Sequence, residues 1–289
     1  MSKPTLVLLT GATLVAFAAN SLLCRMALGD GAMDPKVFTA IRLASGAAVL
    51  APLWWFATRR RSHVRAGSWG SGFALFVYAM GFSLAYVSLD TGVGALILFA
   101  AVQATMLGAG WRQGERPSAA EWIGLVTAMA GLAYLVRPGT ASPDPIGVAL
   151  MVAAGVGWGV YSVRGRATST PTATTAENFL LSVPWAIASV LVFGPGSSIG
   201  PPRAVVLAVI SGAITSGLGY VLWYAVLRHL TTTRAAIVQL SVPVLAAVAG
   251  IVVLGEPATL RLGLASAMIL GGVGFAISQR QTTPLAIDR

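Results

Sequence analysis

Long stretches of the chain carry no charged side chain, and this feature most limits how it can fold. One such run is TGVGALILFAAVQATMLGAGW, residues 91–111. A helix needs about 20 mostly apolar residues to cross the hydrocarbon core of a bilayer. Since ten segments come close to this length, we predict an all-α integral membrane protein with ten transmembrane helices. The predicted spans cover residues 4–25, 35–57, 68–89, 91–111, 119–136, 145–163, 177–194, 203–227, 233–254 and 258–279.

The composition agrees with a lipid environment. The chain is 56% hydrophobic and 10% charged, whereas soluble domains are about 25% charged. Its net charge of +10 lies mostly in short gaps between apolar runs. Nucleic-acid binding needs basic residues clustered on one face, so we expect the bilayer as partner and no nucleic acid. The single cysteine, Cys24, lies in an apolar run and is predicted to be a buried core residue.

The distribution of lysine and arginine predicts the orientation. With the N-terminus placed on one side, most of the 19 cations fall on that side. Cytoplasmic loops carry the excess of Lys and Arg, so we expect both termini in the cytoplasm and the protein in a bacterial-type inner (plasma) membrane. Tryptophans near the same side fit an interfacial belt: Trp54, Trp55, Trp69, Trp111 and Trp122.

A phrase of the sequence occurs twice, about half a chain length apart. GERPSAAEWIGLVTAM at 114–129 returns as GEPATLRLGLASAM at 255–268. Aligning the phrases predicts a five-helix repeat at 1–136, a linker at 137–144, a second repeat at 145–279 and a cytoplasmic tail at 280–289. Because five is odd, the second repeat enters from the opposite side. Inverted repeats of this kind are common among secondary transporters.

The repeated phrase itself is predicted to be structural. Gly114 and Gly255 suit left-handed helix ends, and we expect structural roles for Glu115 and Glu256. Ser118 and Glu121 have the spacing of a capping box, in which serine and glutamate satisfy the first free N–H groups of a helix. A further close-packing face is predicted for the tenth span, where Gly263, Ala267 and Gly271 recur every fourth residue. We expect this face to meet the fifth span near Gly124 and Ala128.

Together these motifs resemble the EamA family of the drug/metabolite transporter superfamily. The resemblance includes the two five-span halves, the Gly-Glu-(Arg)-Pro turn before the last span of each half, and an arginine in the second span, FTAIRLASG. Within the family the chain looks most like YddG-type exporters of amino acids and metabolites. The resemblance implies a central cavity between the halves and export of small metabolites. One departure is Val102, where the family often has the proline that the ninth span has at Pro243, so the halves are expected to bend differently.

The predicted spans contain no deep carboxylate. Buried acids usually bind cations or relay protons in membranes, so their absence argues against a cationic-drug antiporter. The sequence has no phosphate-binding G-x-x-x-x-G-K-[ST] loop, and we predict no cofactor and no metal. Both histidines, His63 and His229, lie in loops without a nucleophile or a second ligand. An enzyme is therefore not expected.

Arg42 is the one ionisable residue well inside a predicted span. It could provide a counter-charge for a substrate carboxylate. Alternatively, it could snorkel to the headgroups or pair with Asp34 or Asp90. The sequence favours the second reading.

Polar and aromatic residues in the spans are predicted to line a substrate cavity. Residues four apart lie on one helix face, and amides that face lipid would leave their donors unmet. Gln239 lies one turn before Pro243. Because proline has no N–H to donate to the backbone carbonyl of Gln239, a hinge is expected at Pro243. The candidate cavity residues are Asn20, Ser21, Tyr78, Phe82, Tyr86, Gln103, Trp158, Tyr161, Tyr220, Trp223, Tyr224 and Gln239.

We therefore predict a monomeric inner-membrane secondary transporter with a small-molecule substrate. An aromatic cavity with a few amides and no acid suits uncharged or zwitterionic metabolites, amino acids with aromatic or apolar side chains above all. The expected mechanism is alternating access around that cavity. Two alternatives stay open: a nucleotide-sugar or other metabolite carrier of the same superfamily, and a membrane receptor or assembly protein that transports nothing.

Overall fold

The computed structural model describes residues 1–289 except 30, 59–65, 137–142, 195–198, 257 and 279–289. The described helices form ten spans, as predicted. Seven are long and apolar enough to cross a membrane, and three contain shorter apolar stretches. The elements are α1 (Lys3–Leu28), α2 (Pro35–Thr58), α3 (Trp69–Ala85), α4 (Thr91–Arg112), α5 (Ala119–Val136), α6 (Pro145–Gly165), α7 (Pro171–Phe193), α8 (Pro202–Ile210), η1 (Ser211–Leu218), α9 (Gly219–Leu227), α10 (Thr232–Gln239), α11 (Ser241–Leu254) and α12 (Leu260–Ser278).

Burial is reversed relative to a soluble protein. Large apolar side chains such as Leu191 and Leu260 are 77% and 80% exposed on the outside of the bundle. Polar side chains, including Asn20, Arg42 and Gln239, are at most 1% exposed inside it. Apolar groups face lipid while polar groups find partners inside the protein. The chain is an all-helical, multi-pass membrane protein.

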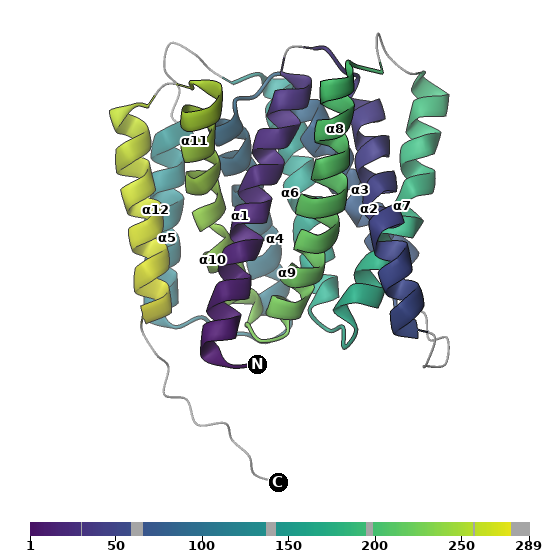
Figure 1. The fold of residues 1–289 in the computed structure, drawn as a ribbon. Coiled ribbons are helices and arrows are strands. Elements are labelled where there is room, and N and C mark those ends of the chain that lie inside the picture. Colours follow the sequence, from purple (N-terminus) through teal and green to yellow (C-terminus); the bar gives the residue numbers. More distant parts are fainter. Residues whose placement is uncertain (30, 59–65, 137–142, 195–198, 257, 279–289) are drawn as a thin grey trace.

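The helices run up and down between two ends of the bundle (Figure 1). The start of α1 and the end of α12 lie at the same end, called here the lower end as in the figure. Most of the predicted linker, the arginine-rich loop 59–65 and the predicted tail lie outside the described residues.

Corresponding helices of the two halves make corresponding contacts. At one edge α5 packs against α12, and at the other α2 packs against α7. In the centre α3 packs against α6, and the corresponding elements α8, η1 and α9 pack against α1. Likewise, α4 contacts α6 while α11 contacts α1. The centre of the bundle is therefore built from both halves of the chain.

The two halves differ in their breaks. Span four is the continuous helix α4, whereas span nine is interrupted at Leu240 between α10 and α11. Pro243, which lacks an N–H and would clash with the carbonyl four residues earlier, explains this break. Span eight contains the π-helix η1, and its counterpart α3 is regular. Span four, which has Val102 where a proline was expected, therefore stays continuous where span nine is broken.

The repeated Gly-Glu phrase caps helices across the halves. Gly114 and Gly255 have positive φ values of 80° and 69°, the predicted left-handed conformation. The Glu115 carboxylate accepts hydrogen bonds from the backbone N–H groups of Thr232 (2.9 Å) and Thr233 (3.1 Å), at the start of α10. Glu256 accepts from the Thr91 N–H at 3.2 Å and from its hydroxyl at 2.7 Å, at the start of α4. Each glutamate therefore satisfies a helix N-terminus of the other half.

The Glu115 carboxyl has a perturbed pKa. Burial raises this pKa, but the hydrogen bonds from Thr232 and Thr233 outweigh burial and hold it below its usual value. Arg166 adds an ion pair at 2.7 Å. At the start of α5, Glu121 accepts from the Ser118 N–H at 2.8 Å while its own N–H donates to the Ser118 hydroxyl at 3.2 Å. This is the predicted capping box.

The small-residue face predicted for α12 is wrong in register. A Cβ added at Gly263 or Gly271 would meet nothing within 4 Å. At Gly272, in contrast, it would overlap the carbonyl oxygen of Gly124 and lie 3.0 Å from the Ala128 N. The α5 side of the contact is as predicted, but α12 is rotated by one residue.

Helix α7 begins six residues before its predicted start at 177, because Pro171 suits the first turn of a helix. Glu177 therefore lies in the second turn of α7 and not at its first residue. Its carboxylate accepts from the Trp54 indole at 3.1 Å and from the backbone N–H groups of Ala66 and Gly67. It is a structural contact near the lower end.

Candidate functional site: a buried arginine in an aromatic centre

A guanidinium group lies in the middle of the bundle. Arg42, from α2, is 1% exposed. Its Nε donates to the Ser216 hydroxyl at 2.9 Å, and its Nη2 donates to the hydroxyls of Tyr78 (3.0 Å) and Tyr220 (2.8 Å). Its Cζ lies 5.1 Å from the ring centre of Tyr78 and 5.2 Å from that of Phe82. Neutral hydroxyls and aromatic faces therefore surround the charge.

The expectation that Arg42 snorkels or pairs with Asp34 or Asp90 is wrong. Asp90 pairs with Arg25 at 3.4 Å, and Asp34 pairs with Lys36 at 3.6 Å. None of the ion pairs among the described residues includes Arg42. The side chain extends into the centre because α2 packs against η1 and α3, which supply Ser216 and Tyr78. The third partner, Tyr220, comes from α9.

Asn20 connects the two halves beside this arginine. Its Nδ2 donates to the Tyr78 hydroxyl at 3.2 Å. Its Oδ1 accepts from the hydroxyls of Ser211 (2.6 Å) and Thr215 (3.1 Å), with Ser216 at 3.5 Å. These three residues lie on η1, whose wider turn differs from the α-helical spacing; π-helical turns often mark functional sites. We call Asn20, Arg42, Tyr78, Ser211, Thr215, Ser216 and Tyr220 the central polar cluster.

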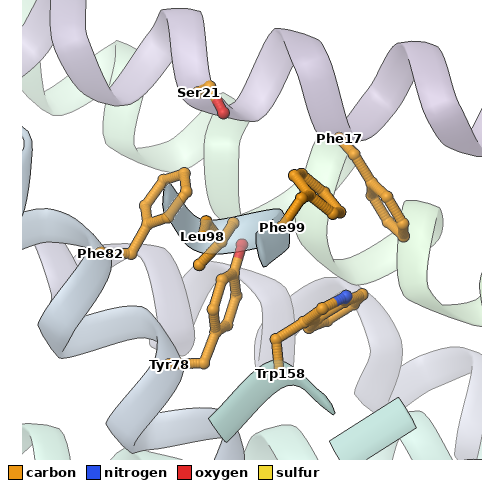
Figure 2. A pocket seen from close by; sticks show the side chains of 7 residues that line it. All are labelled: Phe17, Ser21, Tyr78, Phe82, Leu98, Phe99 and Trp158. Carbon is orange, nitrogen blue, oxygen red and sulfur yellow. The ribbon is translucent and has the colours of Figure 1, made fainter. Parts of the chain in front are cut away.

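A small cavity adjoins this cluster (Figure 2). Its volume is about 10 Å³, room for about one water molecule. Figure 2 shows the Tyr78 ring in its wall, with its hydroxyl between Phe82 and Phe99 and with Trp158 beside Phe17. The walls consist of Phe17, Ser21, Tyr78, Phe82, Leu98, Phe99 and Trp158.

Gln239 positions one wall of the cavity and is not itself in the wall. The Trp158 indole N–H donates to Gln239 Oε1 at 2.8 Å, and the amide nitrogen of Gln239 contacts Met106 Sδ at 3.3 Å. Trp158 also packs edge-on against Phe17 with ring centres 5.1 Å apart. The amide therefore holds the indole from behind.

A second aromatic group extends from the cluster toward the lower end. Tyr161 stacks on Tyr224 with ring centres 4.9 Å apart and lies 6.2 Å from Tyr220. Trp223 donates to the Ser162 hydroxyl at 3.1 Å. Tyr224 also lines a hollow of about 390 Å³ at the lower end, together with Ala66, Ser68, Ser71, Arg164, Ala167, Thr168 and Thr174. Aromatic residues thus connect this hollow with Arg42.

Tyr86 and Gln103 lie outside the cavity wall, the central polar cluster and the lower aromatic group. Tyr86 donates to the Thr91 carbonyl at 3.2 Å near the upper end, and Gln103 donates to the Ala236 carbonyl. Both therefore join helices. The structure places Asn20, Tyr78 and Tyr220 in the polar cluster, Ser21, Phe82 and Trp158 in the cavity wall, and Tyr161, Trp223 and Tyr224 in the lower aromatic group.

Sequence reasoning missed five residues of the site: Phe17, Leu98, Phe99, Ser211 and Thr215. Phe17 lies four residues before Ser21, on the same helix face, so spacing could have found it. Ser211 likewise lies four residues before Thr215. Leu98 and Phe99 sit in a uniformly apolar run that gives no signal. Among the described residues, no three His, Cys, Asp or Glu gather where they could hold a metal.

Comparisons with known proteins place this geometry in context. Residues 145–278 match the sequence model of the EamA-like transporter family. An uncharacterized protein of Pseudomonas aeruginosa is 46% identical over 274 residues, 95% of each chain. An uncharacterized transporter of Archaeoglobus fulgidus is 25% identical over 215 residues, 72% of this chain and 75% of that protein. A protein of known crystal structure has the same fold, with a TM-score of 0.75, 21% identity, and coverage of 97% of this chain and 100% of that one.

Proposed function

Because the chain belongs to the EamA-like transporter family, we propose that it is a secondary transporter exporting small uncharged or zwitterionic metabolites. Amino acids with aromatic or apolar side chains, as in YddG-type exporters, fit best. The observation that carries this proposal is the aromatic cavity beside the central polar cluster. Ligand sites are mostly apolar, with a few placed polar groups.

The proposed mechanism is alternating access between two inverted repeats, 1–136 and 145–279. The exchangeable helix contacts support this division, and the cavity draws its walls from α1, α3, α4 and α6. A cavity of about 10 Å³ is far too small for an amino acid. Transport therefore requires the walls to separate, and the breaks at η1 and Leu240 are the places where the helices can bend.

The charge distribution supports the substrate class. Among the described spans the acidic residues lie near helix ends, so a cationic substrate has no counter-charge in the centre. Arg42 is the one cation there. The positive-inside distribution supports cytoplasmic termini, and export is then movement from the lower toward the upper end.

Transport by the purified protein in liposomes tests the proposal. We would load vesicles with unlabelled L-phenylalanine or L-leucine and measure counterflow of the labelled amino acid. Protein-free vesicles, and vesicles with an unrelated ten-span protein, serve as controls. Saturable counterflow inhibited by the other amino acid is expected. Flux equal to the controls for a panel of aromatic and branched amino acids would refute this function.

A further inference from the structure

We propose that the guanidinium of Arg42 binds the carboxylate of the transported molecule, so that the substrates are monocarboxylates. The inference rests on the proposed transport function and narrows its substrate class. Arg42, Tyr78 and Tyr220 would form the carboxylate subsite, and the cavity lined by Phe17, Phe82 and Trp158 would receive the apolar part.

The first argument is charge. A guanidinium removed from water loses its hydration, and burial is favourable only when an anion or many acceptors replace it. Arg42 is 1% exposed and forms no ion pair with a described residue. The rings of Tyr78 and Phe82 provide a partial replacement through cation–π contacts. An intramembrane ionisable residue without a protein counter-charge is a candidate for substrate binding.

The second argument is the surplus of donors. Three groups donate toward the single hydroxyl oxygen of Tyr78: Asn20 Nδ2 at 3.2 Å, Arg42 Nη2 at 3.0 Å and the Tyr220 hydroxyl at 3.1 Å. A hydroxyl oxygen has two lone pairs. Meanwhile Arg42 Nη1 is buried and has no hydrogen-bond partner among the described residues. A carboxylate, which only accepts, supplies what this donor-rich centre lacks.

The third argument is geometry. An arginine binds a carboxylate best through two parallel N–H···O bonds along one edge of the guanidinium. Along the Nη1–Nη2 edge of Arg42, Nη1 is unpartnered and Nη2 contacts two hydroxyls that can be displaced. Tyr78 both contacts Arg42 and lines the cavity. Movement of its ring would therefore open the arginine to a ligand in the cavity.

The hydroxyl contact between Tyr78 and Tyr220 spans the two halves of the chain, 3.1 Å apart. A ligand carboxylate that takes over the Nη2 bonds releases both hydroxyls at once. Ligand binding would then remove the bond from Arg42 to Tyr220, one of several contacts that join the halves at their centre. This couples occupancy of the subsite to opening.

The subsite also predicts selectivity. One guanidinium neutralises one carboxylate, so an amide analogue would leave the charge of Arg42 unpaired. A site built to bind a polar group strongly rejects analogues that lack this group. We would measure thermal stabilisation of the purified protein by L-phenylalanine, L-leucine and 3-phenylpropionate, each beside its amide. The carboxylates should act at concentrations at least about tenfold lower than their amides.

Variants separate binding from folding. Arg42→Met should abolish the difference between acid and amide, and Arg42→Lys should keep part of it, because lysine retains the charge without the fork. The matched control is Arg25→Gln, which removes an arginine that pairs with Asp90 near the upper end and should leave the difference unchanged. If Arg42→Met does not fold, the comparison of acids with amides on the unaltered protein still decides.

The outcomes distinguish the two proposals. Carboxylate stabilisation without amino-acid flux would refute the transport function and leave the subsite standing. Equal action of acids and amides would overturn the subsite, even in a protein that transports both. No stabilisation of the unaltered protein by any of the three carboxylates would overturn it as well, and so would an unchanged acid–amide difference in Arg42→Met.

Discussion

Gln239→Ala removes the acceptor of a buried indole. Trp158 and Gln239 are 2% and 0% exposed, so water cannot replace the 2.8 Å hydrogen bond between them. Helix–helix hydrogen bonds in membranes average about 0.6 kcal/mol, but an unsatisfied buried donor costs about 1–3 kcal/mol. We expect the second effect to dominate, so the free energy of unfolding should fall by about 1–3 kcal/mol. Flux should fall several-fold, because Trp158 forms a wall of the cavity.

A double-mutant cycle tests this reasoning. The unfolding free energies of Gln239→Ala, Trp158→Phe and the double variant would be measured in detergent by denaturant titration. Trp158→Phe removes the indole N–H, so adding it to Gln239→Ala should cost less than it costs alone. We expect a coupling of about 1 kcal/mol or more. Additivity within about 0.5 kcal/mol would show that the hydrogen bond does not hold the indole in place.

Three further predictions concern other parts of the molecule. Gly212→Ala should abolish folded protein, because the new Cβ would overlap the Arg42 carbonyl and the Ser45 hydroxyl. The control Gly271→Ala, whose Cβ would meet nothing within 4 Å, should behave like the parent in size-exclusion chromatography. A monodisperse Gly212→Ala protein would contradict the α2–η1 packing. Glu115→Gln should lower the thermal unfolding midpoint at pH 7, and the difference should shrink as pH falls below about 4.3, because a carboxyl with a lowered pKa contributes stability above its unfolded pKa and loses it as it is protonated. A constant difference from pH 7 to pH 3 would contradict the cap. In intact cells an impermeant thiol reagent should label a cysteine introduced at Ala258 but not one introduced at Gln113, since the two positions lie at opposite ends of the bundle. The reverse pattern would invert the proposed orientation. The native Cys24 is buried and should add no background labelling.

The ten spans and the proline break could be predicted because each depends on local sequence. Apolar run length decides whether a helix spans a bilayer, and Pro243 cannot complete a helical hydrogen bond wherever it sits. The sequence predicts the start of α7 six residues late, because its first six residues, PTATTA, are too weakly apolar to count toward a span. The α12 face was missed by one residue, since several small residues fit a spacing of four and only packing selects among them.

The aromatic members of the site could be predicted from helix periodicity, but the environment of Arg42 could not. Its partners Tyr78, Ser216 and Tyr220 come from two other spans, and sequence shows neither their distance nor the π-helix that directs Ser216 inward. Conversely, Tyr86 and Gln103 resemble their neighbours in sequence, yet each finds a backbone carbonyl that takes it out of the cavity.

The exchanged caps restrict how this protein can move. Glu115, just after α4, holds the start of α10 at the lower end, and Glu256, just after α11, holds the start of α4 at the upper end. Hydrogen bonds from these glutamates thus connect span four and span nine at both ends of the bundle. Rigid separation of these two spans would break both attachments. A transport cycle that preserves them keeps the ends of these two spans together, which leaves the break at Leu240 and the π-helix η1 as the places where spans nine and eight can change shape.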